Sequence, residues 1–181
     1  MTEQGTVKRV SDDLCRSELS PRESAAWDGF LRAHAAMFRI GDSRVQREHG
    51  ITIKESEVLL MLAREEHLQM RMSDLAVAID LSASGTTRLV ERLERRGLVS
   101  RKPCPSDRRG HLALLTESGR ELASKARSSL AGAVREHFLN HFSDDDLDRM
   151  ISFWERLLEG AGQEISDFGG SALPVAQVRP D

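Results

Sequence analysis

One stretch, Ser73 to Leu115, constrains the fold of this chain more than any other. Its first half carries the signals of two short helices separated by a tight turn. Its second half carries two strand-like runs, Leu98–Lys102 and His111–Leu115, joined by the turn-forming sequence PCPSDRRG. The order helix, turn, helix and two-stranded hairpin predicts a mainly α-helical fold with a small β-wing.

Capping residues and apolar spacing define the two helices. Ser73 can cap the first helix and Ser82 the second. Leu89 and Leu93, four residues apart, form the inner face of the second helix. Gly97 follows two arginines and suits the left-handed position that ends a helix. The spacing therefore predicts a helix-turn-helix with defined ends.

The outward face of the second helix begins with small hydroxyl side chains and an arginine, which suits the end of a helix that enters a major groove. Two arginines at the exposed hairpin tip suit the narrow minor groove. We expect Asp107 to orient Arg109 through a bidentate ion pair. The expected DNA-binding residues are Ser82, Ser84, Thr86, Thr87, Arg88, Arg108 and Arg109.

The charge distribution supports a polyanionic partner. Eight cations and three anions lie between positions 82 and 109, a local charge of +5 in a chain whose formal net charge is −3. A cationic patch on an acidic protein is the usual footprint of nucleic acid. Ordinary charges on a solvated helix and hairpin are the simpler alternative.

These residues resemble the winged helix-turn-helix of the MarR family of bacterial transcriptional regulators. The resemblance is carried by RLVERLERRGLVSR, by the wing sequence DRRG, and by the following LALLTESGREL. It extends more loosely from about Pro21 to Gly160. It implies an obligate homodimer, a pseudo-palindromic operator in double-stranded DNA, wing arginines in the minor groove, and a small-molecule pocket beside the dimer-forming helices. By the same analogy, we expect a repressor that a ligand releases.

The rest of the chain divides around this DNA-binding lobe, which we place at about 52–115. We expect a flexible arm at 1–20, a long helix over 21–49, and dimerisation through this helix and the segment 116–160. A T-x-x-E capping box predicts a helix that starts at Thr52, and a short strand is expected at 70–72. The amphipathic helix after Ser143 needs a partner for its apolar face, and a second subunit supplies one. The Gly-, Pro- and Ser-rich segment 161–181 is expected to be a disordered tail.

An aromatic stripe on the first long helix suggests what an effector would look like. Aromatic surfaces favour a planar ring, and a nearby cation or hydrogen-bonding group favours an acid on that ring. The expected effector is a small aromatic acid or phenol, bound by Trp27, His34, Phe38 and Arg39. The alternative is that the aromatic residues form dimer core.

Other functions are less well supported. Cys15 is the basis for a redox-responsive alternative, but this chain has 0 Tyr and the cysteine precedes the first expected helix. His137 and His141 have zinc-compatible spacing, yet they are read as a polar helix end, so no metal or other cofactor is expected. No GxSxG, phosphate loop or HExxH motif is present, so no enzyme is expected. A winged-helix protein-interaction module would leave the basic wing unexplained.

Two observations bound the cellular setting. With 2 Cys, far apart in sequence, the chain has no disulfide framework, and the reducing cytoplasm is the expected location. No apolar run reaches the length of a membrane span, and the N-terminus has no signal-peptide core, so no membrane association is expected.

Overall fold

The computed structural model describes residues 18–104 and 107–160, and at 107–109 it describes the backbone alone. The chain divides into two compact units, one ending at Arg39 and the other beginning at Ile40. The expected arm at 1–20, except for its last three residues, and the expected tail at 161–181 lie outside the described residues.

The long first helix is confirmed. Helix α2 spans Pro21–His49 and ends at Gly50, whose φ of 65° is in the left-handed region. At its start, the backbone N–H of Ser20 donates to Glu23 Oε2 at 2.7 Å and the N–H of Glu23 donates to Ser20 Oγ at 3.3 Å. This reciprocal pair satisfies two N–H groups that have no partner within the helix.

Helix α3 (Ile53–Arg64) begins at the predicted capping box. Thr52 Oγ1 accepts a bond from the backbone N–H of Glu55, and the Glu55 carboxylate accepts one from the N–H of Thr52 at 2.9 Å. Val58, Leu59 and Leu62 are fully buried and form the centre of the core.

The helix-turn-helix consists of α4 (Met72–Ala78) and α5 (Ala83–Arg95). The predicted cap at Ser73 is wrong. Helix α4 begins at Met72 with Arg71 before it, no side chain caps it, and Ser73 Oγ donates to Asp74 instead. The preceding strand ends at Arg71, so the chain passes directly from strand to helix and Ser73 is already inside the first turn.

A small antiparallel sheet forms the wing and its base. It contains β1 (Gln69–Arg71), β2 (Val99–Cys104) and β3 (Asp107–Leu115) in the order β1-β3-β2. The strand expected at 70–72 is found one residue earlier and pairs with β3, Met70 lying opposite Ala113. The hairpin of β2 and β3 is called the wing below. The observed architecture, mainly α with a small β-wing, confirms the predicted fold class.

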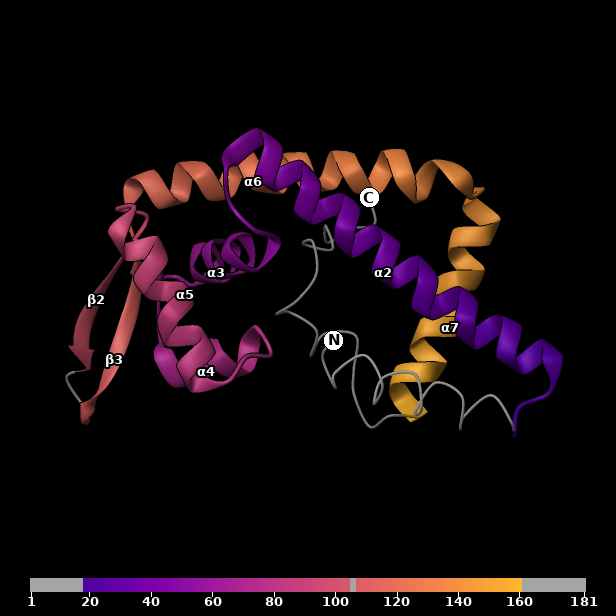
Figure 1. The fold of residues 1–181 in the computed structure, drawn as a ribbon, viewed down its shortest axis with the longest axis horizontal. Helices are drawn as coiled ribbons and strands as arrows, with labels where there is room; N and C mark the ends of the chain where they lie inside the picture. The colour runs from indigo at the N-terminus through magenta and orange to yellow at the C-terminus, as the bar shows by residue number, and fades with distance from the viewer. Residues whose placement is uncertain (1–17, 105–106, 161–181) are drawn as a thin grey trace, which may run out of the picture. The chain divides into compact units, whose positions relative to one another are not determined.

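Helix α6 (Glu117–His137) follows the wing, and a short 3-10 turn (Leu139–His141) leads to α7 (Asp144–Gly160). Thr116 and Ser143 cap these two helices, since their side chains accept bonds from Gly119 N and Asp146 N. Figure 1 shows α6 passing along α3, with the wing leaving from its N-terminal end.

The N-terminal end of α6 lies directly against the segment that follows α5. Thr116 Oγ1 donates to the carbonyls of Gly97 at 2.8 Å and Leu98 at 3.0 Å. A Cβ added to Gly119 would lie 2.0 Å from the Leu98 carbonyl oxygen, so only glycine permits this approach. The helix that leads away from the DNA-binding lobe is therefore fixed to it at one tight contact.

One hydrophobic core joins α3, α4, α5, the sheet and α6. Its fully buried members include Ile51, Leu75, Ile79, Val90 and Ala126. None of the helices in the described ranges is long and apolar enough to cross a membrane.

Candidate nucleic-acid interface

The start of α5 presents a surface of small polar side chains. Ser82 caps the helix, with its Oγ accepting from Gly85 N at 3.1 Å, and lies 3.3 Å from the hydroxyl of Ser84. Thr87 Oγ1 donates to the Ala83 carbonyl at 2.9 Å, so its remaining lone pairs and methyl group are left for a neighbour. Ser82 and Ser84 are exposed and Thr87 is partly exposed. These side chains are short enough to let a groove wall approach the backbone.

Thr86 does not belong to this surface, contrary to the prediction. Its side chain is fully buried, and its Oγ1 donates to the Ser82 carbonyl at 3.1 Å. At 100° per residue, Thr86 shares a face with Leu89, Val90 and Leu93, which pack into the core. The helical period that identified the leucines therefore also identifies Thr86 as an inner residue.

Arg92 of α5 and Arg96 directly after it are held by other parts of the lobe, and Arg95 is held by α5 itself. Arg92 Nε donates to Glu55 at 3.2 Å, Arg96 donates to the Gly50 carbonyl at 3.0 Å, and Arg95 donates to the Glu91 carbonyl at 3.3 Å. Arg88 is exposed and forms no ion pair with any residue that the structure describes. The local charge of +5 thus overstates the charge available to a partner, and Arg88 is the cation of α5 best placed to meet a phosphate.

The ion pair between Glu55 of α3 and Arg92 of α5 contributes to a lowered pKa of the Glu55 carboxylate. Burial raises the pKa of Glu55, but the Thr52 N–H and the Arg92 guanidinium lower it by more, so the pKa lies below its ordinary value. Glu55 therefore stays ionised while it caps α3 and holds Arg92 on α5. The Glu55 carboxylate therefore links the start of α3 to the side of α5.

Arg101 of the wing forms ion pairs with α5. Its Nη2 lies 2.7 Å from Glu94 Oε2, its backbone N–H donates to the same carboxylate, and its Nη1 lies 3.5 Å from Glu91. These contacts neutralise two acidic side chains of α5 and hold the wing against this helix.

The backbone of Asp107, Arg108 and Arg109 lies in β3, as the predicted hairpin requires. Their side chains lie outside what the structure describes. The expected ion pair between Asp107 and Arg109 and the expected minor-groove contacts are therefore still predictions.

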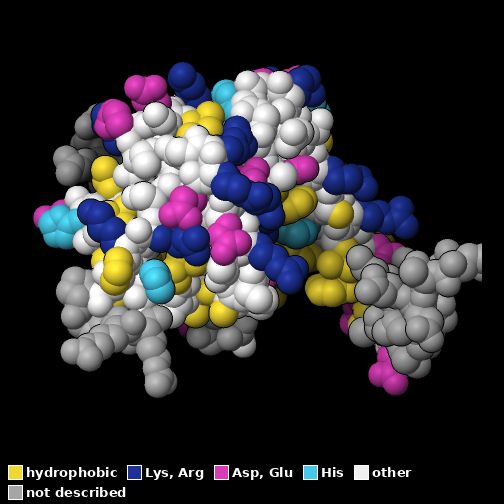
Figure 2. Space-filling view, turned by 60° about the vertical axis from the view of Figure 1, so that its left-hand side comes forward, with side chains coloured by type: hydrophobic (Ala, Val, Ile, Leu, Met, Phe, Trp, Pro, Cys, Tyr) yellow, Lys and Arg dark blue, Asp and Glu magenta, His cyan; other side chains and the backbone are white. Residues whose placement is uncertain are grey.

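A hollow of about 510 Å³ opens between the start of α4, the start of α5 and the wing. Arg71 and His111, both exposed, belong to its lining, and sequence reasoning did not select either of them. Cys104 also lines it but is only 7% exposed. Figure 2 shows the wing side of the molecule, where Lys and Arg side chains are spread across the face among acidic ones. The hollow gives the surface a concave part beside the start of α5.

The expected effector residues lie on α2, in the unit that ends at Arg39. Trp27, His34, Phe38 and Arg39 are all exposed. Phe30 lies between two of them: its ring centroid is 5.9 Å from that of Trp27 and 6.4 Å from that of His34. The structure thus brings two of the four residues, Trp27 and His34, into one aromatic row with Phe30.

The residues considered as metal ligands or as a redox site, His137, His141 and Cys15, are located as follows. Within the described ranges, no group of three or more His, Cys, Asp or Glu side chains converges on one point. His137 Nε2 lies 3.5 Å from Glu136 at the end of α6. Cys15 lies outside the described residues.

Known proteins resemble this chain in sequence and in structure. A model of the MarR family matches residues 49–110. The uncharacterized HTH-type transcriptional regulator YfiV of Bacillus subtilis is 29% identical over 104 residues, which make up 58% of this chain and 63% of YfiV. The match therefore spans less than two thirds of that relative.

Two solved structures from Streptomyces coelicolor have the same fold. The MarR family transcriptional regulator AbsC is 34% identical, with 80% of this chain and 98% of AbsC covered and a TM-score of 0.72. Sco3205, a MarR family transcriptional regulator solved in complex with DNA, is 27% identical, with 78% and 89% covered and a TM-score of 0.72. From the winged helix-turn-helix and from its identity to AbsC over nearly the whole of AbsC, this chain belongs to the MarR family of transcriptional regulators.

Proposed function

We propose that this protein is a transcriptional regulator that binds duplex DNA through the start of α5. The observation that carries the proposal is the surface of Ser82, Ser84, Thr87 and Arg88 at the start of α5, which is exposed except at the partly buried Thr87 and lies beside a hollow. Sco3205, which has the same fold, is solved in complex with DNA. In the proposed complex this end of α5 enters the major groove, the small hydroxyl groups contact base edges, and Arg88 contacts a phosphate.

The wing has a separate part in this proposal. Arg108 and Arg109 at its tip enter the adjacent minor groove, where negative potential is concentrated, and Asp107 orients Arg109. Arg101, held by Glu94, fixes the angle between the wing and α5. Groove contact by α5 ends near Glu91, whose carboxylate lies beside Arg101.

The active species is proposed to be a homodimer. Helix α7 exposes a stripe of large apolar side chains, with Ile151 51% and Leu157 56% exposed. A second copy buries such a stripe in a two-fold arrangement, and the operator is then a pseudo-palindrome with half-site centres roughly 34 Å apart. Replacing both residues by glutamate should yield a helical monomer or an unfolded chain, which sedimentation and circular dichroism distinguish. A stable dimer of the double variant would exclude α7 from the interface.

A pair of matched substitutions tests the DNA-binding surface. Ser84 and Ser118 are both exposed and both occupy the second position of a helix, in α5 and α6. Aspartate at this position stabilises a helix by about 0.3–1 kcal/mol through the helix dipole. Ser84→Asp should therefore keep or raise stability while it weakens binding to a duplex from upstream of the gene, because its charge faces phosphate. Ser118→Asp should keep both the stability and the DNA affinity of wild type.

The readout is fluorescence anisotropy with that duplex, alongside thermal unfolding of each variant. We expect at least a tenfold loss of affinity for Ser84→Asp, the size of one charge-assisted contact. Equal affinities for Ser84→Asp and Ser118→Asp would remove the start of α5 from the interface.

We further propose that the regulator represses and that a small aromatic acid or phenol releases it. The exposed aromatic row of Trp27, Phe30 and His34 on α2 supports an aromatic ligand, with Phe38 and Arg39 further along the same helix. Calorimetric titration of salicylate into wild type and His34→Ala tests this, paired with operator release. Absence of binding below millimolar concentration would end the aromatic-acid proposal without affecting DNA binding.

A further inference from the structure

The hollow beside the start of α5 is lined by two sulfur side chains and an imidazole. Met72 at the first residue of α4, Cys104 at the end of β2 and His111 in β3 all belong to its lining. The proposed DNA contacts use none of these three side chains. His137 and His141, the pair with zinc-compatible spacing, lie outside this lining.

The register of the sheet places Met72 and His111 on one face. Ala113 is buried and lies opposite Met70. Side chains two residues apart along a strand point to the same face, so His111 shares the face of Ala113. Met72 follows Met70 by two residues, and Arg71 between them has extended backbone, with φ −65° and ψ 144°. The alternation therefore continues to the point where β1 passes into α4.

A β-bulge brings Cys104 to the same face. The pairing of β2 with β3 shifts register between Pro103, which lies opposite His111, and Cys104. Strict alternation would turn Pro103 and Cys104 to opposite faces, whereas a bulge re-aims the side chain that follows it. Cys104 is accordingly buried, at 7% exposed, and lines the same hollow as His111. Three possible metal ligands from three elements thus face one hollow.

The chemistry of these three side chains indicates a soft metal ion. Thiolate and thioether sulfur select Cu(I), and imidazole also suits copper, whereas Mg²⁺ and Ca²⁺ require oxygen ligands. Arg71 and Arg101 line the same hollow, and their charge repels a divalent ion. Cu(I) bound to a thiolate adds no net charge, so this repulsion is small.

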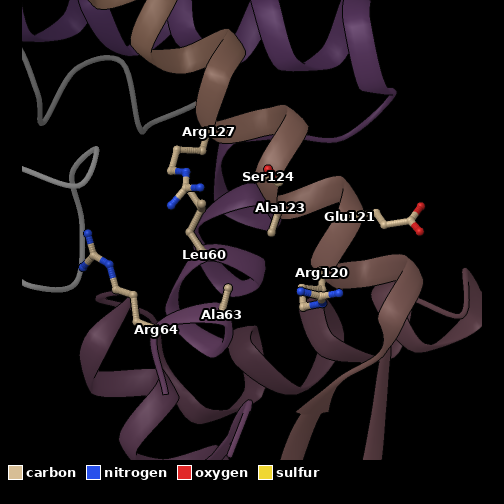
Figure 3. Close-up of a pocket in the computed structure, with 8 residues that line it drawn as sticks. All are labelled: Leu60, Ala63, Arg64, Arg120, Glu121, Ala123, Ser124 and Arg127. Atoms are coloured by element: carbon tan, nitrogen blue, oxygen red, sulfur yellow. The ribbon is translucent and has the colours of Figure 1, made fainter. Parts of the chain in front are cut away.

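The cavity between α3 and α6 has a different chemistry. Figure 3 shows its lining, which consists of arginine, glutamate, serine and aliphatic side chains. That lining offers a soft ion neither sulfur nor imidazole. Among these two hollows, the one beside α5 is therefore the candidate for a soft metal.

We propose that the hollow beside α5 binds one Cu(I) ion through Cys104 Sγ, Met72 Sδ and a ring nitrogen of His111. On binding, the Cys104 thiol releases its proton to solvent and the thiolate sulfur coordinates the ion, with no electron transferred. The ion links the start of α4 to both strands of the wing, so it stabilises the folded protein according to its occupancy. This proposal does not depend on DNA binding.

The test is anaerobic titration of the full-length protein with Cu(I) held by the chromogenic chelator bicinchoninate, in the absence of DNA. Wild type should remove one Cu(I) per chain from the chelator. Cys104→Ser should abolish this transfer, and Met72→Leu and His111→Gln should each weaken binding at least about tenfold. Met72→Leu conserves side-chain volume and His111 is exposed, so these two variants keep the test decisive if Cys104→Ser does not fold.

Two control variants separate this site from other sulfur atoms. Met70→Leu is the matched control, because Met70 lies in the adjoining strand β1 and outside the lining of the hollow. Cys15→Ser controls for the other cysteine of the chain. Both should bind Cu(I) as wild type does. X-ray absorption at the copper edge should show two sulfur neighbours and one imidazole nitrogen in the loaded wild type.

The outcomes that would overturn the proposal are specific. Unchanged Cu(I) binding in Cys104→Ser, or in both Met72→Leu and His111→Gln, would exclude these side chains as the ligands. Loss of the ion in Cys15→Ser would assign it to that cysteine instead. A Zn²⁺ affinity equal to that for Cu(I) would contradict the choice of a soft monovalent ion.

Discussion

Replacing Gly119 with alanine should destabilise this protein, although the same change in the middle of most helices does the opposite. Alanine is favoured over glycine in a helix by about 0.5–1 kcal/mol. At Gly119, however, the new Cβ would lie 2.0 Å from the Leu98 carbonyl oxygen, 2.8 Å from Leu115 Cδ1 and 3.0 Å from the Leu98 carbonyl carbon. Two of these atoms belong to the backbone, so no side-chain rotation relieves the overlap.

The size of the effect follows from the displacement required. The added Cβ would lie 2.0 Å from the Leu98 carbonyl oxygen, and ordinary contact begins at 3.4 Å. Helix α6 and Leu98 must therefore separate by about 1.4 Å. Such overpacking costs about 1–3 kcal/mol. The Thr116 bonds to Gly97 and Leu98 cross the same contact, and weakening them costs about 1 kcal/mol more. After the gain in helix propensity, a net loss of about 1–3 kcal/mol remains.

Gly132→Ala is the matched control, because Gly132 lies in the same helix and an added Cβ meets nothing within 4 Å in the chain. Urea unfolding followed by circular dichroism, at equal protein concentrations, gives the two free energies. Gly132→Ala should be neutral or up to about 1 kcal/mol more stable. If Gly119→Ala matched it, the tight contact between α6 and Leu98 would not exist as described.

Three further substitutions have distinct expected outcomes. Thr86→Val removes a buried hydrogen bond to Ser82 and should cost about 1 kcal/mol in urea unfolding, with DNA affinity unchanged; a large loss of affinity without a loss of stability would return Thr86 to the interface. Burial raises the pKa of Glu57 while Lys54, whose Nζ is 2.8 Å away, opposes the rise. The folded state therefore favours the protonated acid, and stability is lost as the pH rises through the folded pKa, so Glu57→Gln should gain in stability on wild type as the pH rises above the ordinary glutamate pKa of about 4; a pH-independent difference in unfolding free energy would contradict this. Arg109→Ala should weaken DNA binding and lower the salt slope by about one unit per subunit, and an unchanged affinity and slope would remove the wing tip from the proposed complex.

Local sequence signals predicted the elements of this fold well. The capping residues Thr52 and Ser82 begin helices where expected, because a cap needs only residues within one turn. The long first helix and its end at Gly50 follow from equally local information. Ser73 failed as a cap because the preceding strand, held by its pairing with β3, extends to Arg71.

Features that depend on distant parts of the chain were not predicted. Cys104 is buried because the pairing of β2 with β3 shifts register between Pro103 and Cys104, and simple alternation along the strand does not reveal that shift. The partners of Arg92 and Arg96 lie in α3 and at Gly50, 37 and 46 residues away. A count of charges in sequence cannot identify such pairs. Thr86 is different, because the helical period already placed it on the inner face.

The salt dependence of DNA binding tests the central proposal most directly. Wild type, Arg88→Gln and Arg135→Gln are titrated into a duplex from upstream of the gene at a series of salt concentrations, and the logarithm of the binding constant is plotted against that of salt. Both arginines are exposed, so both variants lose one surface charge per subunit. Because each lost phosphate contact lowers the slope by about 0.9, a dimer of Arg88→Gln should lose about two units, while Arg135→Gln should match wild type. A wild-type constant that is insensitive to salt, or equal slopes for all three proteins, would contradict DNA binding through the start of α5.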